Sequence, residues 1–189
     1  MTDEKRLFYP PGGILIWFII ILEMLTFLGA IIVFAYQRSI DEASFIESQS
    51  HLSIVMGTAN TIVLITSGFL MAKTIYYLKK DQIKNAKKTL LFTVLLGVVF
   101  LIIKSIEYSQ KIEHGYTFDS STFFTFYWML TAFHFVHVLF GIGLLSYMYL
   151  ALKKGKYSST DFYDIETSGI YWHMCDLIWI LIFPILYLL

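Results

Sequence analysis

The distribution of apolar residues divides the sequence into five long hydrophobic segments separated by short polar connections. Residues 52–72 contain no charged side chain, and neither do residues 120–152 when histidine is counted as neutral. Segments of this length exceed what a buried helix of a soluble protein needs, and they can cross about 30 Å of hydrocarbon at about 1.5 Å per residue. The pattern predicts transmembrane spans at about residues 14–36, 52–77, 88–108, 122–150 and 168–189.

Inside a membrane these segments are expected to be α-helices. Hydrocarbon offers no hydrogen-bond partner for unpaired backbone groups, and the sequence lacks the period-two alternation of barrel strands. The first segment is too long for a signal-peptide core and has no small-residue cleavage site after it, so it is expected to remain as an anchor. We therefore predict an all-α fold, an integral membrane bundle of five transmembrane helices in a single domain over residues 1–189.

The composition supports this fold class and excludes several others. Hydrophobic residues make up 57% of the 189 positions and charged residues only 15%. A soluble domain of this size could not bury that much apolar surface. The 14 basic and 14 acidic residues cancel, so the chain lacks the electrostatic footprint of a nucleic-acid partner. The single cysteine, Cys175, excludes an intrachain disulfide framework, thiolate zinc sites and iron–sulfur clusters formed by this chain alone.

Basic residues are concentrated in alternate connections between the predicted spans. The connections around 78–88 and at 151–167 are lysine-rich, whereas those at 37–51 and 109–121 carry one lysine or arginine each. The basic set comprises Lys5, Arg6, Lys79, Lys80, Lys84, Lys87, Lys88, Lys153, Lys154 and Lys156. Because lysine and arginine are retained on the cytoplasmic side, the pattern predicts a cytoplasmic N-terminus and an external C-terminus.

Ionisable residues inside the predicted spans are the main candidates for function. They are Glu23 in the first span, Lys104 and Glu107 in the third, His134 and His137 in the fourth, and His173 and Asp176 in the fifth. A charged side chain at the centre of a span costs about 2.5–3.5 kcal/mol on translocon scales, so such groups face the bundle interior or a wet cavity. Three of the pairs have i,i+3 spacing, which places both members on one face of a helix.

Depths estimated from the helical rise per residue arrange these groups into two polar layers. The inner layer contains Glu23, His173 and Asp176, the outer layer contains Lys104, Glu107 and His134, and His137 lies between them.

The sequence leaves three roles open for these polar groups. Hydrogen bonds between helices would hold the bundle together without further function. Glu23 has no basic partner within a turn on its own helix, and burial favours its protonated form, which makes it a candidate proton carrier. A zinc or non-haem iron site is the third role, although the Glu-x-x-His pattern of di-iron bundles is absent. Its candidate ligands are His134, His137, His173 and Asp176.

Two stretches near the C-terminus resemble the family signature of subunit III of haem-copper (cytochrome c) oxidases. They are FFTFYWMLTAFHFVHVLFG at residues 123–141 and YWHMCDLIW at residues 171–179, which follows the W-H-x-x-D-x-x-W pattern of the family's final helix. Shorter matches precede them in the family's order: Glu23 with Phe27, Asn60-Thr61 with Ser67-Gly68, and Glu107-Tyr108. The resemblance covers almost the whole chain, and five matches in order are more specific than any one of them.

The resemblance implies a non-catalytic subunit of a bacterial terminal oxidase in the cytoplasmic (inner) membrane. In this family subunit III binds no redox centre and lies beside catalytic subunit I, whose haems and copper reduce oxygen to water in aerobic respiration. The family's subunit III supports assembly, structural phospholipid binding and proton uptake by the catalytic subunit. By carry-over, Glu23 is the family's buried carboxylate, and His134, His137, His173 and Asp176 belong to its polar core.

Many family members have seven helices, and this chain resembles the last five. In the longer members a lipid-filled cleft separates the first two helices from the rest. Five-helix versions also occur in a sister group associated with nitric oxide reductases, and Lys104 and the ending at residues 179–187 resemble that group as well. The alternatives that stay open are this sister group, a stand-alone metal-dependent membrane enzyme and a proton-conducting transporter.

Overall fold

The computed structural model describes residues 10–189 and contains six α-helices in that range. Five of them are long and apolar enough to cross a membrane, which confirms the predicted number of spans. The helices are α2 (Ile14–Ile40), α3 (Glu42–Ser50), α4 (Ile54–Lys79), α5 (Ile83–Glu113), α6 (Thr122–Lys153) and α7 (Tyr163–Tyr187). Lys5 and Arg6, which contributed to the orientation prediction, lie outside the described residues.

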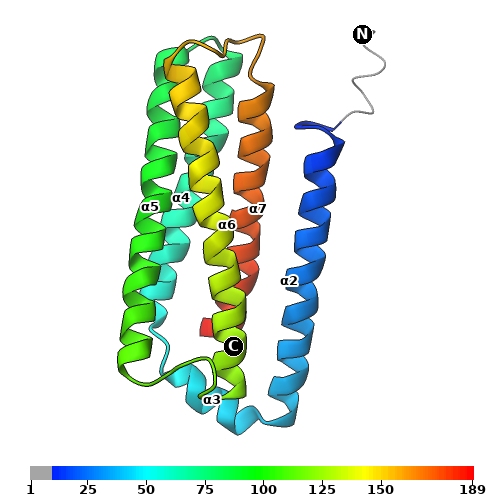
Figure 1. Cartoon of the computed structure of the whole chain (residues 1–189), viewed down its shortest axis with the longest axis vertical. Helices are drawn as coiled ribbons and strands as arrows, with labels where there is room; N and C mark the ends of the chain where they lie inside the picture. The colour runs from blue at the N-terminus through cyan, green and yellow to red at the C-terminus, as the bar shows by residue number, and fades with distance from the viewer. Residues whose placement is uncertain (1–9) are drawn as a thin grey trace.

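Four of the long helices form an antiparallel bundle, and α2 lies against its side (Figure 1). The helices that contact each other around the bundle are α4 and α5, α5 and α6, α6 and α7, and α7 and α4. α2 packs against α6 and α7, while the short α3 packs against the N-terminal end of α6. Short connections between consecutive helices favour this antiparallel arrangement of neighbours.

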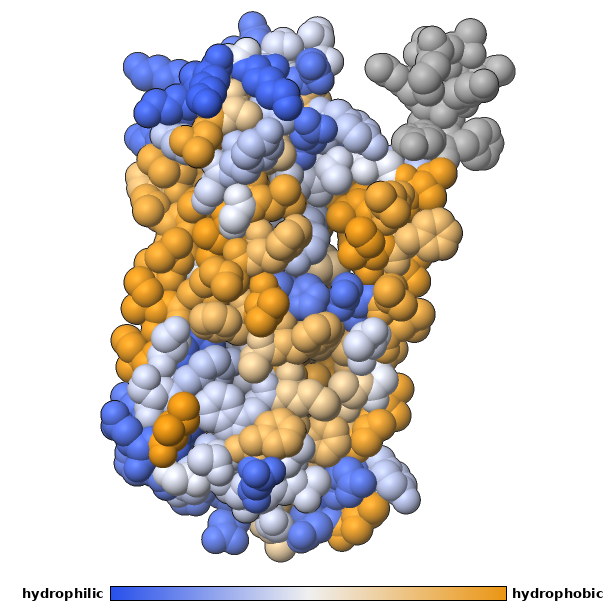
Figure 2. Space-filling model, in the orientation of Figure 1, coloured by the Kyte–Doolittle hydropathy of each residue, from blue (hydrophilic) through white to orange (hydrophobic). Residues whose placement is uncertain are grey.

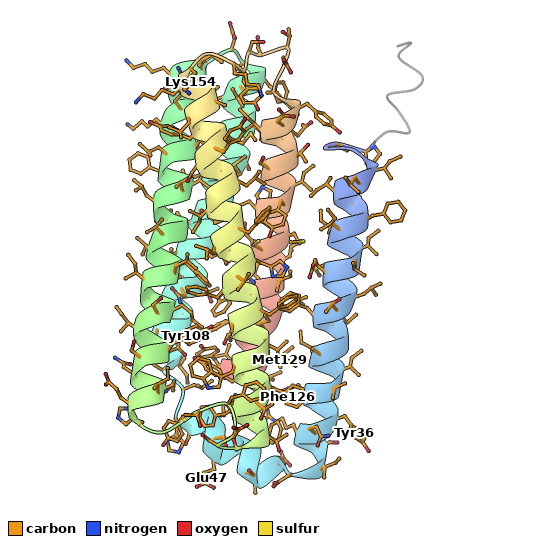
Figure 3. All side chains as sticks on the ribbon, in the orientation of Figure 1. Tyr36, Glu47, Tyr108, Phe126, Met129 and Lys154 are labelled. Atoms are coloured by element: carbon orange, nitrogen blue, oxygen red, sulfur yellow. The ribbon has the colours of Figure 1, made fainter. Side chains whose placement is uncertain are left out.

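The connections alternate between the two ends of the bundle (Figure 1). The lysine-rich connections, α4–α5 and α6–α7, lie at the same end as the start of α2. Figure 3 shows Lys154 at this end, with Tyr36 and Glu47 at the opposite end near α3. This is the arrangement that the orientation prediction requires, and the assignment of the lysine-rich end to the cytoplasm stays a prediction.

The connection after the first span contains a helix, α3, that the hydropathy pattern did not predict. The side chain of Asp41 caps it by accepting a hydrogen bond from the Ser44 backbone N–H at 3.3 Å. Phe45 is buried, and the Ser48 hydroxyl lies 3.1 Å from the Ser121 hydroxyl at the start of α6. A nine-residue helix has too little periodicity to stand out in sequence, and it is stabilised by its cap and by packing against the bundle.

The outer surface has a hydrophobic belt between two hydrophilic ends (Figure 2). Large apolar side chains on the helices are widely exposed, for example Leu15 on α2 at 75%, Val55 on α4 at 79% and Phe140 on α6 at 60%. Apolar surface on this scale is stable in contact with hydrocarbon or with a partner. The chain is therefore a multi-pass membrane protein.

Trp172 of α7 fills the centre of the four-helix bundle and is fully buried. Its indole N–H donates to the hydroxyl of Ser67 on α4 at 3.1 Å. A Cβ added at Gly97 of α5 would lie 2.7 Å from the Trp172 ring, and one at Gly141 of α6 would lie 2.9 Å from it. The indole fits because glycine stands at both facing positions, and it joins α7 to the other three helices of the bundle.

Candidate intramembrane polar site

Glu23 and His137 form a contact that links α2 to α6. Glu23 Oε2 lies 3.3 Å from His137 Nε2, and the two side chains are 20% and 11% exposed. Phe27 and Phe133 flank the imidazole, with ring centroids 5.8 and 4.6 Å away. Figure 2 shows a small hydrophilic group at mid-height between α2 and the bundle, inside the hydrophobic belt. Glu23 therefore has a histidine partner from another helix.

The hydrogen bond of His137 to the main chain determines which ring nitrogen faces Glu23. His137 Nδ1 lies 2.8 Å from the main-chain oxygen of Phe133, which can only accept, so Nδ1 carries a proton. Nε2 then faces Glu23 with either a second proton or a lone pair. The contact is favourable when one proton lies between the two groups, on the imidazole or on the carboxyl group. The contact is therefore a hydrogen bond between Glu23 and His137 for either position of that proton.

This pairing differs from the layers estimated from sequence. The depths estimated from the helical rise predict that Glu23 lies in one layer with His173 and Asp176, and that His137 lies between the two layers. The structure instead pairs Glu23 with His137, and His173 with Asp176. The difference arises because the rotation of α2 about its axis turns Glu23 toward α6, and depth estimates carry no information on rotation.

Lys104 and Glu107 lie in a second polar group, which is fully buried. Lys104 Nζ lies 3.1 Å from Glu107 Oε2 and donates to the Tyr187 hydroxyl at 2.6 Å. The hydroxyls of Tyr127 and Tyr187 donate to Glu107 Oε1 at 2.9 and 2.6 Å. Side chains from α5, α6 and α7 therefore meet in one network in which each charge has an opposite charge and neutral partners. A buried ion pair offsets its desolvation only when such additional bonds are present.

His134 was expected in the layer of Lys104 and Glu107, and it lies beside them without joining their hydrogen bonds. Its ring stacks on Trp179 with centroids 5.4 Å apart and meets Phe100 at 5.7 Å. Lys104 Nζ lies 5.3 Å from the same Trp179 ring. Both ring nitrogens of His134 are buried and form no hydrogen bond within residues 10–189. Aromatic contacts therefore connect His134 to the Lys104 network.

His173 and Asp176 form a third polar group, on one face of α7 as their spacing predicts. His173 Nδ1 lies 3.3 Å from Asp176 Oδ2, with 43% of the histidine side chain and 10% of the aspartate side chain exposed. A Cβ at Gly68 of α4 would collide with the Asp176 carboxyl group, so glycine at this position lets α4 approach. The pair lies in a shallow groove of about 440 Å³ between α4 and α7. The imidazole is therefore partly open to the outside of the bundle, whereas the carboxyl group is buried against α4, where its Oδ1 has no hydrogen-bond partner within residues 10–189.

These positions do not assemble the metal-ligand set considered from sequence. That set required His134, His137, His173 and Asp176 to meet. His137 faces Glu23 on α2 instead, His173 faces Asp176, and His134 stacks on an indole. In the described part of the chain, residues 10–189, no group of three or more histidine, cysteine, aspartate or glutamate side chains is placed to hold a metal ion.

The sequence motifs of α4 and α7 contact one another along one seam. Trp179 donates its indole N–H to the Thr61 hydroxyl at 2.9 Å. Trp172 donates in the same way to Ser67 at 3.1 Å, and Ser67 in turn donates to the main-chain oxygen of Thr93 at 3.0 Å. Both tryptophans of the W-H-x-x-D-x-x-W pattern are therefore held by hydroxyl groups of α4. The motif residues form the packing between these two helices.

Tyr127 and Tyr187 belong to the polar interior, although the sequence alone does not indicate it. The position of Tyr127 offers one signal. Tyr127 lies five residues after the start of α6 at Thr122, and Glu107 lies six residues before the end of α5 at Glu113, so both are at a similar distance from the connection between these helices. Similar depth on adjacent helices makes a contact plausible. Tyr187 is the last residue of α7, where a tyrosine is expected to anchor the helix at the interface, so its inward orientation gave no signal.

The fold and these groups define a class: a multi-pass helical membrane protein whose ionisable side chains are paired between helices. Comparison with known proteins gives the family. Residues 13–189 match the model of the cytochrome c oxidase subunit III family. The chain belongs to this family.

Individual relatives agree with the family match. The cytochrome c oxidase subunit 3 of Synechocystis sp. is 32% identical over 171 residues, which cover 90% of this chain and 72% of the relative. The proteins of that name from Corynebacterium diphtheriae and Thermostichus vulcanus are 28% and 30% identical, covering 87% and 94% of this chain and 82% and 86% of the relatives. These matches confirm the resemblance to subunit III, whereas the likeness to the nitric-oxide-reductase-associated group stays a prediction.

Proposed function

We propose that this chain acts as subunit III of a bacterial cytochrome c oxidase-type terminal oxidase in the cytoplasmic membrane. Its membership of the subunit III family and its bacterial relatives of that name support the proposal. In this proposal the haems and copper that reduce oxygen belong to catalytic subunit I, and this chain binds neither. Its role is to support the assembly, lipid packing and proton uptake of the catalytic subunit.

The observation that carries a role in proton uptake is the contact between Glu23 and His137. A carboxyl group in the hydrocarbon region is unfavourable as an isolated charge, so it is either protonated or paired. Its partner here is histidine, the side chain whose charge changes most readily near neutral pH. A proton can move from one group to the other without leaving an isolated charge on either. A group that serves only as helix packing does not need this property.

The pair also lies where a neighbouring subunit can reach it. α2 packs on the side of the four-helix bundle rather than inside it (Figure 1). One fifth of the Glu23 side chain is exposed at the contact between α2 and α6. Protons held at this seam are therefore close to the outer surface of the subunit, where the catalytic subunit is proposed to lie.

The proposal orients the chain with its lysine-rich end in the cytoplasm and its C-terminus outside. Glu23 then lies nine residues into α2 from Ile14, or about 14 Å along the helix. A proton that enters from the cytoplasm reaches the pair about halfway across the membrane. This depth suits a relay between the cytoplasm and a buried reaction centre.

The Glu23→Gln variant tests the proton role. The glutamine amide can donate a hydrogen bond to His137 Nε2, so the contact is kept while the exchangeable proton of the carboxyl group is lost. We expect the complex to assemble with normal haem content and to turn over more slowly, most clearly at high pH, where protons are scarce. The matched control is Glu47→Gln, which removes an exposed carboxyl group on α3 and should leave turnover unchanged.

The outcomes separate the two parts of the proposal. Failure of Glu23→Gln to assemble would show that Glu23 is a structural partner of His137. A Glu23→Gln complex with wild-type turnover at every pH would contradict the proton role and leave the subunit assignment standing. Absence of the oxidase from preparations of the wild-type chain would contradict the subunit assignment itself.

A further inference from the structure

A groove of about 430 Å³ lies at the end of the bundle opposite the lysine-rich connections (Figure 1). It is formed by the connection between α3 and α4 and by the C-terminal end of α5 with the connection that follows. Its polar lining includes His51, Ser53, Gln110 and Lys111, and within residues 10–189 none of its lining side chains carries a carboxyl group. The groove therefore offers hydrogen-bond donors and a positive charge without a negative charge beside them.

Lys111 supplies the positive charge, and it is buried. The residue is only 8% exposed, and its ammonium group donates to the main-chain oxygen of His51. It forms no ion pair within residues 10–189. Glu107, one turn earlier on α5, is already paired with Lys104. Along α5, therefore, two buried ammonium groups accompany one buried carboxylate, and a buried charge without a counter-charge is unfavourable.

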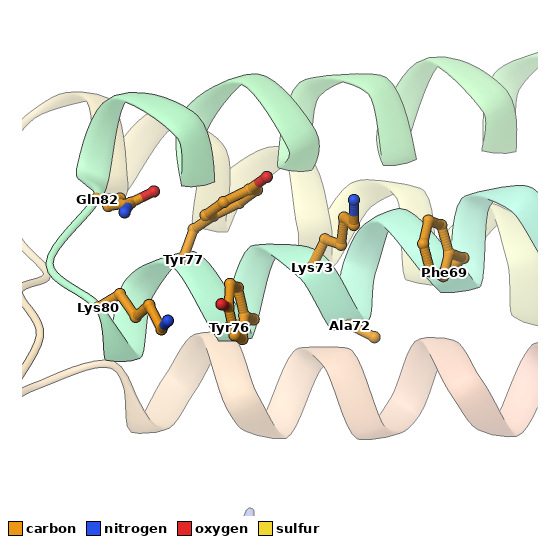
Figure 4. Close-up of a pocket in the computed structure, with 7 residues that line it drawn as sticks. All are labelled: Phe69, Ala72, Lys73, Tyr76, Tyr77, Lys80 and Gln82. Carbon is orange, nitrogen blue, oxygen red and sulfur yellow. The ribbon is translucent and has the colours of Figure 1, made fainter.

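Exposed lysines on α4 show the contrasting case. Lys73 and Lys80 also form no ion pair in the described part of the chain, but both are exposed. Figure 4 shows them along α4 with Tyr76 between them. Water solvates an exposed ammonium group, so these charges need no bound anion. Lys111 has lost most of that solvation, and an anion in the adjoining groove would compensate its charge.

Several donors from the start of α4 and the end of α5 border the same groove. Ser53 caps α4 by accepting a hydrogen bond from the Met56 N–H at 3.3 Å, which leaves its hydroxyl proton free to donate. The first N–H groups of α4 have no partner within the helix and carry partial positive charge. The ring of His51 stacks on Tyr116 with centroids 4.6 Å apart, and even a neutral imidazole has one N–H. The amide of Gln110 completes a set of donors that only the folded bundle brings together.

We propose that this groove binds one small oxyanion, a phosphate or a carboxylate, from the surrounding solution. Lys111 compensates the charge of the anion. The oxygens of the anion accept hydrogen bonds from the His51 imidazole, the Gln110 amide and the Ser53 hydroxyl. An oxyanion suits the groove better than a halide does, because its separate oxygens can meet donors that come from two different elements. This inference goes beyond the proposed role in an oxidase and does not depend on it.

The test measures phosphate binding by the native complex. The complex is purified in mild detergent and equilibrated with radiolabelled inorganic phosphate, with chloride in excess to screen diffuse attraction. We expect one saturable phosphate per copy of this chain. Gln110→Glu should weaken its binding by about tenfold or more, because the new carboxylate lies in the groove and becomes the partner of Lys111. Gln110 is exposed, so this change should leave the fold intact. Ser109→Glu is the matched control, because it adds the same charge to the neighbouring exposed residue outside the groove.

Two further variants remove donors from the groove. Lys111→Met should weaken phosphate binding by about tenfold or more. Its control is Arg38→Gln, which removes a basic side chain at the same end of the bundle, outside the groove. His51→Phe keeps a ring that can stack on Tyr116 and loses the N–H, so it tests the site even where Lys111→Met fails to assemble.

Four outcomes would overturn the proposal. The first is a wild-type complex without saturable phosphate binding, and the second is wild-type binding by Gln110→Glu or His51→Phe. The third is an equal loss in Ser109→Glu or Arg38→Gln, because the attraction would then be diffuse. The fourth is a co-purified phospholipid that blocks phosphate binding and is lost in Gln110→Glu, because the groove would then hold a lipid headgroup and no free anion.

Discussion

The buried Lys104–Glu107 pair is where removal of one charge should destabilise the bundle most. Both side chains are only 1% exposed, and they are joined at 3.1 Å. Lys104→Met leaves the Glu107 carboxylate with hydroxyl donors from Tyr127 and Tyr187 and without a cation. Loss of one partner of a buried pair costs about 3–5 kcal/mol, so we expect Lys104→Met to lower the free energy of unfolding by that amount.

The double variant Lys104→Met/Glu107→Gln should be more stable than either single variant. Removing both charges eliminates the desolvation cost, and the glutamine oxygen still accepts hydrogen bonds from the two tyrosines. We expect a net loss of no more than about 2 kcal/mol, which implies strong coupling between the two sites. The assay is reversible unfolding in mixed micelles with increasing sodium dodecyl sulfate, followed by circular dichroism.

Lys84→Met is the matched control, because Lys84 is an exposed lysine on the same helix. Its free energy of unfolding should stay within about 0.5 kcal/mol of wild type. Mutual dependence of the two charges is refuted if Lys104→Met lowers the free energy of unfolding as little as Lys84→Met does. It is also refuted if the losses of the two single variants simply add in the double variant, because the charges would then not depend on one another.

Two further changes test the packing of α7. Asp176→Asn replaces the carboxyl group that faces His173 with a neutral amide, and the free energy of unfolding should fall by about 1–2 kcal/mol; unchanged stability in detergent would count against the pair. Gly97→Val adds a Cβ where the Trp172 ring leaves only 2.7 Å, and overpacking should cost about 1–3 kcal/mol. Gly143→Val, whose Cβ meets open space, is its control, and equal losses in the two would contradict the packing argument.

The membrane spans could be predicted from sequence because their signal is local. A run such as residues 52–72 has no charged side chain, and no other structure accommodates it as well as a membrane helix. α3 escaped prediction for the opposite reason. Its nine residues contain few apolar side chains, and Phe45 is buried only because α3 packs against the rest of the protein.

The polar groups show the same division between local and distant information. Helical spacing alone brings Lys104 close to Glu107, because residues three apart share a face. The contact between Glu23 and His137 depends on how α2 and α6 are rotated against each other, and that rotation is set by packing along the whole interface.

The tyrosines of the Lys104 network illustrate a further limit. Tyr187 is fully buried at the end of its helix, although hydropathy and position both favour the interface for tyrosine. It turns inward because its hydroxyl bonds both Lys104 and Glu107. The inward orientation of Tyr187 can be predicted only when the positions of Lys104 and Glu107 relative to α7 are known.

We propose that this chain works as part of a haem-copper oxidase and has no redox centre of its own. The most direct test is to purify the chain gently from its native membrane through an affinity tag and to record the haem spectrum and subunit composition. We predict that a catalytic subunit carrying haem is recovered in equal amount, and that the haem stays with that subunit when the two are separated. Recovery of this chain alone, with a stoichiometric prosthetic group bound to it, would contradict its assignment as a subunit without a redox centre.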